Sequence, residues 1–232
     1  MTERLFKVLN EDGSACHGGH GAWHLPESDR PGDWMPIIEG ELIPCKNGYH
    51  LCREQDLVHW LGEAIFEVEY RGEQVDSGDK IVVREARLLR RCENWNERTA
   101  RLFACDCAEH VLHIFEQQYP GHNQPRHAIE TSRKYAGGNA TKAELAAAGA
   151  AARTAAGAGP RDAAGAAAGA AARAAARAAP RAAAGAGAGA TAGDAAWAAA
   201  AARDAAGAAA RAAAAEREWQ TSQLMQLLYP GA

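Results

Sequence analysis

Large aliphatic residues are missing from one long internal stretch, since no leucine, isoleucine, valine or phenylalanine occurs between Leu145 and Leu224. Residues 143–215 are almost entirely alanine, glycine and widely spaced arginine. Alanine is the best helix former, but its side chain has almost no apolar surface to bury. The absence excludes an ordinary leucine-rich core in this tract. It predicts helices that pack only by close approach of their backbones.

Signals for export and for membrane insertion are also missing. Residues 1–14 lack the apolar core of a signal peptide. The alanine tract is long enough to span a bilayer, but arginines interrupt it and alanine is too weakly hydrophobic to offset them. These arginines are Arg153, Arg161, Arg173, Arg177, Arg181, Arg203 and Arg211. We therefore expect a cytoplasmic protein without a membrane partner, with its six cysteines as reduced thiols.

A strong excess of positive charge is absent as well. The formal net charge is -4, which argues against a general nucleic-acid binder. After Lys142, however, every basic residue is arginine, and arginines outnumber acidic residues in the alanine tract. Nucleic-acid binding through an arginine face of the alanine-rich helices therefore stays open as an alternative, although the acidic balance of the whole chain weighs against it.

The periodicity of apolar residues predicts an α+β N-terminal domain over residues 1–91, which we interpret as a recognition domain. Alternating patterns and turn residues indicate strands at 4–9, 37–38, 41–43, 64–70 and 80–84, the last extending towards 91. A turn is predicted at 46–48 and a short helix near 53–61.

Helical spacing dominates from residue 95, and predicts an all-α, alanine-rich, close-packed bundle over residues 92–232. We expect helices at 95–115 and 124–135, a capping box at Thr141 and Glu144 that opens the alanine tract, and a last helix that ends near Leu228. Trp197 and Trp219 are candidate anchors for these helices. Close-packed alanine faces would also suit a homodimer interface.

Four potential zinc ligands occur close together: Cys105, Cys107, His110 and His113. On one helix Cys105 points away from the face that carries Cys107 and His110, and no CxxC pair is present. We therefore predict no metal site, keep these four residues as weak candidates, and interpret them as buried cysteines and surface histidines.

Charged residues gather on the two helices before the alanine tract. They are Asp106, Glu109, Arg126, Glu130 and Arg133. One interpretation is a network of salt bridges between the helices, and the other is a partner-binding surface. No phosphate loop, GxSxG or HExxH motif is present. The sequence therefore predicts no catalytic residue and no cofactor, and an enzyme is the less favoured hypothesis.

Motifs in this helical region resemble those of the putative immunity proteins of bacterial polymorphic toxin systems. In that family a helix reading CAEHVL…FE is followed by a second reading RPRxAIE and by an alanine-rich helical region. Here residues 97–116 contain the first motif, and the second has Gln124 in place of arginine. The resemblance covers about residues 95–228. It implies a toxin or effector protein as partner, neutralised by occlusion without catalysis.

The N-terminal domain is similar to small uncharacterised domains of actinobacterial and phage proteins. Its segment 47–52, followed by a strand at 66–70, also resembles ADP-ribosyltransferase-like folds. That resemblance implies an NAD-using transferase as an alternative to a non-catalytic recognition domain, with Tyr49, His50 and Cys52 as pocket candidates. It supplies no complete catalytic set, and Glu85 is a poor candidate for a catalytic glutamate.

Overall fold

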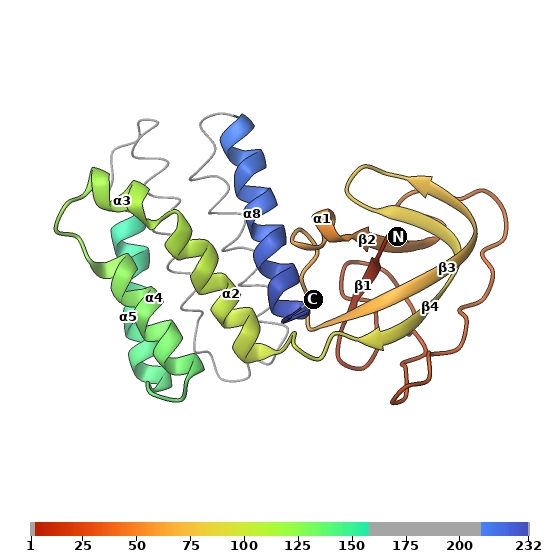
Figure 1. Cartoon of the computed structure of the whole chain (residues 1–232), viewed down its shortest axis with the longest axis horizontal. Helices are drawn as coiled ribbons and strands as arrows, with labels where there is room; N and C mark the ends of the chain where they lie inside the picture. Colours follow the sequence, from red (N-terminus) through yellow and green to blue (C-terminus); the bar gives the residue numbers. More distant parts are fainter. Residues whose placement is uncertain (1–2, 158–209, 232) are drawn as a thin grey trace. The chain divides into compact units, whose positions relative to one another are not determined.

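The computed structural model describes residues 3–157 and 210–231 of the chain (Figure 1). The chain divides into two units, Met1–Trp95 and Asn96–Ala232. Most of the alanine tract and the candidate anchor Trp197 lie outside the described residues. Within the described part, no helix has both the length and the apolar character needed to cross a membrane.

The first unit is built on four antiparallel strands that close into a barrel in the order β1-β2-β4-β3 (Figure 1). These strands are β1 (Leu5–Leu9), β2 (Tyr49–Arg53), β3 (Ala64–Asp76) and β4 (Ile81–Arg91). The strands predicted at 4–9, 64–70 and 80–91 are confirmed, and β3 continues six residues further than expected. At the β3–β4 turn, Asp76 Oδ1 accepts a hydrogen bond of 2.8 Å from the backbone N–H of Gly78.

Alternate residues of the strands form the barrel core, as the period of two in a strand requires. Phe66, Val68, Val83 and Leu88 are among its buried members, and Trp23 joins them from the loop after β1. Outward positions carry charges that pair across strands, such as Glu67 with Arg90 at 2.8 Å. The alternation therefore sets which side chains face the core.

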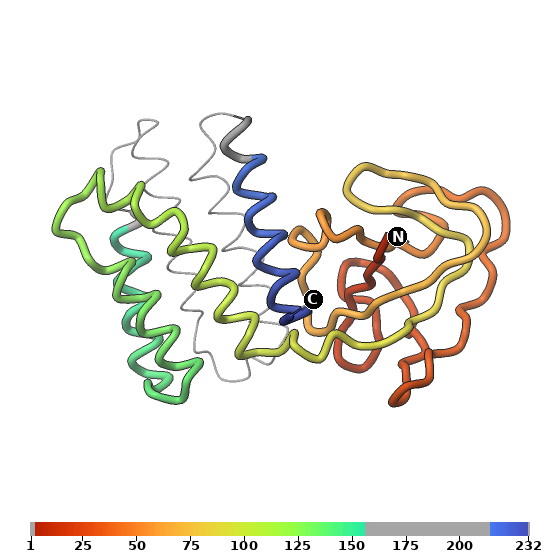
Figure 2. The backbone as a smooth tube through the Cα atoms, in the orientation of Figure 1, coloured from red at the N-terminus to blue at the C-terminus, as the bar shows by residue number. Residues whose placement is uncertain are grey.

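Residues 37–38 and 41–43 do not form the strands that their apolar pairs predict. Figure 2 shows the chain leaving β1, passing along the outside of the β3–β4 hairpin and returning as β2. In this segment Gly32, Met35 and Ile38 donate backbone hydrogen bonds to carbonyls of β4. The donors are spaced by three residues while the acceptors Leu88, Ala86 and Arg84 are spaced by two. Prolines at 31, 36 and 44 lack the N–H that a regular ladder needs.

Two further local predictions need correction in this unit. Residues 49–53, for which the pattern predicts only the preceding turn, form β2 between β1 and β4. The helix expected near 53–61 is the single turn α1 (Glu54–Leu57). After Leu57 the chain tightens into turns in which His59 and Trp60 donate to carbonyls three residues back. The indole N–H of Trp60 is held by the Asp79 carbonyl at 3.0 Å.

The described part of the second unit is helical. Its helices are α2 (Glu97–His110), α3 (Leu112–Gln118), α4 (Gln124–Ala136), α5 (Lys142–Gly157) and α8 (Ala210–Leu228). The helix predicted over 95–115 is instead two helices, because Val111 leaves helical geometry with φ -104° and ψ 3°. Val111 at the break is buried, and so are Leu112 and Phe115 in α3. These apolar residues of α3 therefore stay in the core although the helix axis is interrupted.

Side-chain hydrogen bonds cap the N-termini of α2 and α5. The Asn96 side chain accepts from Thr99 N–H, and Thr99 Oγ1 accepts from Asn96 N–H. The capping box predicted at Thr141 and Glu144 is confirmed, since Glu144 Oε2 accepts from Thr141 N–H at 2.7 Å and Thr141 Oγ1 accepts from Glu144 N–H. Gly138, with φ +76°, lies beyond the end of α4. The last helix ends at Leu228, as predicted.

Helix α2 contacts both α4 and α8, and α4 contacts α5 (Figure 1). At the α4–α5 contact, Ala128 of α4 packs with Leu145, Ala148 and Ala152 of α5. All four are buried, with at most 4% of their surface exposed. Ala148 and Ala152, two alanines near the start of the tract, are thus core residues.

Candidate functional site

Arg133 connects α4 to two carboxylates of α2. Its guanidinium lies 2.7 Å from Asp106 Oδ1 and 2.5 Å from Glu109 Oε2. Asp106 and Glu109 are three residues apart, so they lie on the same face of α2. Three of the five predicted contact residues are therefore brought together as an interhelical ion-pair cluster.

The other two predicted contact residues lie along the exposed side of α4. Arg126 donates two hydrogen bonds to Glu116 of α3, of 2.6 and 2.8 Å, in a bidentate pair. Glu130 is exposed and forms no ion pair with any described residue. Four of the five charges are thus paired within the unit, and Glu130 is left to the solvent.

Burial raises the pKa of Asp106, and Arg133 opposes this shift by hydrogen bonding and charge attraction. Burial also disfavours the charged form of Arg133, but its carboxylate partners reverse this effect and raise the pKa of Arg133. The two groups therefore hold one another in their ionised forms. Removing the arginine would leave a partly buried carboxylate without its counter-ion.

A shallow open hollow of about 320 Å³ lies next to this cluster. It is lined by Asp106, Glu109, His110, Trp219 and Gln223. The rings of His110 and Trp219 stack with centroids 3.8 Å apart and an interplanar angle of 3°. The hollow thus combines two carboxylate-bearing residues of α2 with an aromatic stack that joins α2 to α8.

One hydrogen bond fixes the orientation of His110. Its Nδ1 lies 2.6 Å from Glu216 Oε2, and a carboxylate can only accept, so Nδ1 carries the hydrogen. Glu216 is buried and also accepts from Gln220 Nε2 at 2.7 Å. These α8 residues were absent from the predicted set. The available signal was the return of amphipathic composition after residue 215, which marks a docking helix. The candidate anchor Trp219 on this helix is the residue that stacks on His110 of α2.

The four weak metal candidates do not converge. Cys105 and Cys107 are fully buried, and Cys105 Sγ lies 3.8 Å from the Ile129 carbonyl. Burial raises the pKa of Cys105 to about 11, which favours the neutral thiol over the metal-binding thiolate. His113 is exposed, with its Nδ1 3.2 Å from the His110 carbonyl. Within the described ranges, no group of three His, Cys, Asp or Glu side chains has metal-binding geometry.

Two of the three predicted pocket residues of the first unit line a cavity of about 280 Å³. His50 and Cys52 are in its wall, and Tyr49 is not. Tyr49 lies edge-on to Trp23 and its hydroxyl donates to the Pro36 carbonyl at 2.8 Å. Tyr49 lies on the opposite face of β2 from His50 and Cys52, although Leu51 on that opposite face does reach the wall.

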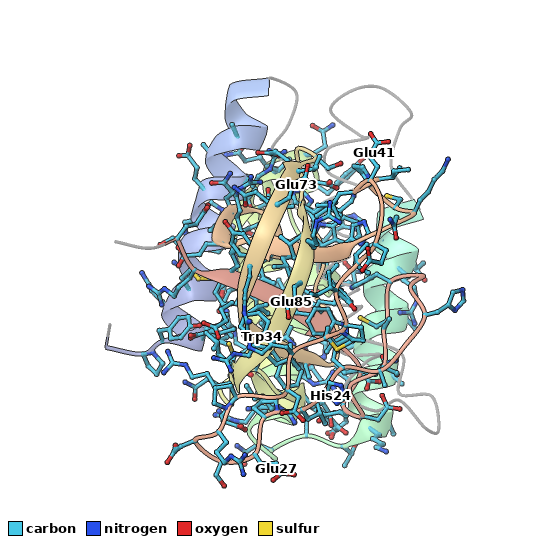
Figure 3. The ribbon with its side chains drawn as sticks, turned by 90° about the vertical axis from the view of Figure 1, so that its right-hand side faces the viewer. His24, Glu27, Trp34, Glu41, Glu73 and Glu85 are labelled. Carbon is cyan, nitrogen blue, oxygen red and sulfur yellow. The ribbon has the colours of Figure 1, made fainter. Side chains whose placement is uncertain are left out.

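A charged aromatic cluster on the β3–β4 hairpin was not predicted. The Trp34 ring lies under two guanidinium groups, 3.4 Å from that of Arg71 and 4.7 Å from that of Arg87. Both arginines also pair with carboxylates, Arg71 with Glu85 and Arg87 with Glu69. Figure 3 shows Trp34 beside Glu85 on the hairpin. The ion pairs balance the charges of both arginines, and the cation–π contacts fix the loop that carries Trp34 to the β3–β4 hairpin.

The helical part of the chain matches a known family. The family model described as Imm-5 like putative immunity protein matches residues 90–227, more than half of the chain. This match confirms the resemblance that the motifs of the helical region predict. No curated protein and no solved structure matches the chain. The resemblances of the N-terminal domain therefore stay predictions.

Proposed function

The chain belongs to the Imm-5 like family of putative immunity proteins, and we propose that it binds a protein toxin and neutralises it by occlusion, without catalysis. The family supports an immunity-type binding function. Occlusion needs a surface complementary in shape and charge to the toxin, and it needs no reactive group.

The observation that carries this proposal is the hollow between α2 and α8 with the charged residues around it. Its wall holds an aromatic stack together with two acidic residues of α2, a combination that suits a partner's cationic or aromatic side chain. The surrounding charges are held by ion pairs before any partner arrives, so little side-chain ordering remains to oppose binding. We propose Asp106, Glu109, Arg126, Glu130 and Arg133 as the contact set.

Neither alternative function is favoured by a specific observation. Of the arginines that would form a nucleic-acid-binding face, most fall in residues 158–209, outside the described part. The alanine faces proposed for a homodimer also lie largely in residues 158–209. In the first unit, the cavity that holds His50 and Cys52 has no carboxylate residue in its wall. A transferase that depends on a glutamate therefore has no support from this cavity.

The test is a charge reversal at the one contact residue that forms no ion pair. We expect Glu130→Lys to weaken binding of a purified cognate toxin by at least about tenfold in calorimetry. Its unfolding free energy should fall by no more than about 1 kcal/mol, because no described ion pair is lost and only the attraction of Arg126 on the same helix is replaced by repulsion. The control is Glu39→Lys, an exposed glutamate of the first unit with the same change in net charge.

Arg133→Glu separates a binding role from a structural one. This change removes both ion pairs to α2 and should lower stability by about 1–2 kcal/mol, because half-exposed pairs are partly screened. Unchanged toxin affinity in the Glu130 and Arg126 reversals together would contradict the proposed contact set. Binding of the toxin by residues 1–95 alone would contradict the assignment to the helical unit.

A further inference from the structure

The cavity of the barrel unit has an unusual charge composition. Lys7 and Lys80 both reach its wall, and no aspartate or glutamate does. Lys7 Nζ donates to the His50 carbonyl at 3.0 Å and lies 5.1 Å from the centre of the Trp23 ring. It forms no ion pair with any residue in the described part. Lys80 pairs with Asp79 at 3.0 Å, outside the wall.

The titratable neighbours of Lys7 do not supply the missing negative charge. Burial raises the pKa of Cys52 to about 12, and burial also raises the pKa of Cys16, so both thiols stay neutral. The pKa of His50 is lowered, first by burial and then by repulsion from the two lysines. Its Nε2 accepts a hydrogen bond of 2.8 Å from the Cys45 N–H, which fits a neutral ring. The wall therefore holds no negative charge to balance Lys7, whose own pKa is lowered by burial.

We propose that this cavity binds a small organic anion, a carboxylate or a phosphate monoester, whose charged group pairs with Lys7. A partly buried ammonium group without a counter-ion is costly, and a bound anion would remove that cost. Val8, Leu51 and Trp60 give the wall apolar patches for the rest of the ligand. A volume of about 280 Å³ leaves room for one ring in addition to the anionic group.

This inference is independent of toxin binding, because the cavity lies in Met1–Trp95 and almost all of the family match lies beyond it. A ligand in the first unit would give the protein a second binding activity. The toxin experiments above can therefore fail without affecting it.

The experiment uses the full chain with three aromatic probes of matched ring size: benzoate, phenyl phosphate and benzyl alcohol. The reporter is the indole N–H of Trp60, which lines the cavity and is fixed by its hydrogen bond to Asp79. We expect saturable shifts of this signal in heteronuclear NMR with at least one anion and none with the neutral alcohol. Which anion binds more tightly distinguishes the carboxylate from the phosphate monoester.

Lys7→Met removes the ammonium group and keeps an unbranched apolar side chain. It should weaken binding of the preferred anion by about tenfold or more, because a charge-assisted hydrogen bond is lost. Lys46→Met is the matched control, since Lys46 is exposed and outside the cavity wall. Equal affinity in the two variants would overturn the role of Lys7.

A second measurement uses the natural protein alone and does not depend on how a variant folds. Cys45 is exposed and lines the cavity. The bound anion should slow its alkylation by iodoacetamide at least about tenfold when ligand is present at many times its dissociation constant. No shift and no protection with either anion at about 10 mM, or equal binding of benzyl alcohol, would overturn the proposal.

Discussion

Replacing Glu216 with alanine should weaken the attachment of α8 to α2 more than its single negative charge suggests. Glu216 is 3% exposed and accepts two hydrogen bonds, from His110 Nδ1 at 2.6 Å and from Gln220 Nε2 at 2.7 Å. His110 can turn towards water after the change, but the buried Gln220 loses the hydrogen bond that its Nε2 donates to Glu216. Losing a hydrogen bond to a charged group costs about 1.5–3 kcal/mol. We expect a total loss of about 2–3 kcal/mol.

A double-mutant cycle isolates the bond between the two helices. His110→Ala also removes the stacking on Trp219, and the cycle with Glu216→Ala cancels that contribution. A hydrogen bond to a charged group contributes about 1.5–3 kcal/mol, so we expect a coupling energy in that range. The control is Glu218→Ala, an exposed glutamate two residues away on the same helix, which should change stability by less than about 0.5 kcal/mol.

Urea unfolding followed by far-ultraviolet circular dichroism is the appropriate assay. Apart from the single turn α1, the described helices belong to the second unit, so this signal reports its unfolding. A coupling energy within about 0.5 kcal/mol of zero would refute the reasoning. The hydrogen bond would then contribute nothing to the docking of α8, and the hollow that contains His110 and Trp219 would lose its structural basis.

Three further predictions concern the barrel unit. Burial lowers the pKa of Lys7 from its ordinary 10.5, so the cost of burying its charge is full below the folded-state pKa and vanishes as pH rises to 10.5. Lys7→Met should therefore raise the urea midpoint at neutral pH, by an amount that shrinks towards about pH 10. Gly48 has φ +136°, and a Cβ there would lie 2.3 Å from a valine methyl of β4. Gly48→Ala should cost about 2 kcal/mol or more in thermal unfolding, and more than Gly40→Ala, where φ is +78° and no atom lies within 4 Å. Mass spectrometry after brief iodoacetamide treatment should find Cys45 modified well before Cys52, because Cys45 is exposed whereas Cys52 is buried with its pKa raised to about 12.

Much of the fold could be predicted because its local signals are strong. The alternation in β3 and the capping box at Thr141 depend on neighbours at most a few residues apart. The strands predicted between residues 31 and 44 were wrong because the structure of this segment depends on distant residues. Its apolar pairs resemble strands, but its prolines lack donors and its hydrogen bonds go to β4, about fifty residues later. This pairing joins residues that are distant in the sequence, so it cannot be predicted from the pattern of a short segment.

The sequence predicted which charged residues belong to the candidate site, but it did not predict which residues they pair with. The sequence left open whether the five charges form salt bridges between the helices or a partner-binding surface. In the structure Arg133 reaches Asp106 and Glu109 on the neighbouring helix, so three of the five form such salt bridges. The bond between His110 and Glu216 joins residues 106 positions apart, with the alanine tract between them. Sequence reasoning had no distance information across that tract. Trp219 could therefore be named as an anchor, but its stacking partner His110 and the bond to Glu216 could not be predicted.

The ion pairs also determine which predicted contact residues can give the most affinity. A charge already held at 2.5–2.7 Å by a partner in the same protein has less to gain from a toxin, because the new interaction must compete with the old one. Asp106, Glu109 and Arg133 are in this position, and their ion pairs hold α4 against α2. Glu130 forms no ion pair among the described residues, although Arg126, four residues earlier on α4, attracts its charge. If the proposed contact set is correct, a cationic group on a toxin would meet the least competition at Glu130, which makes Glu130 the residue where binding and stability should separate most clearly.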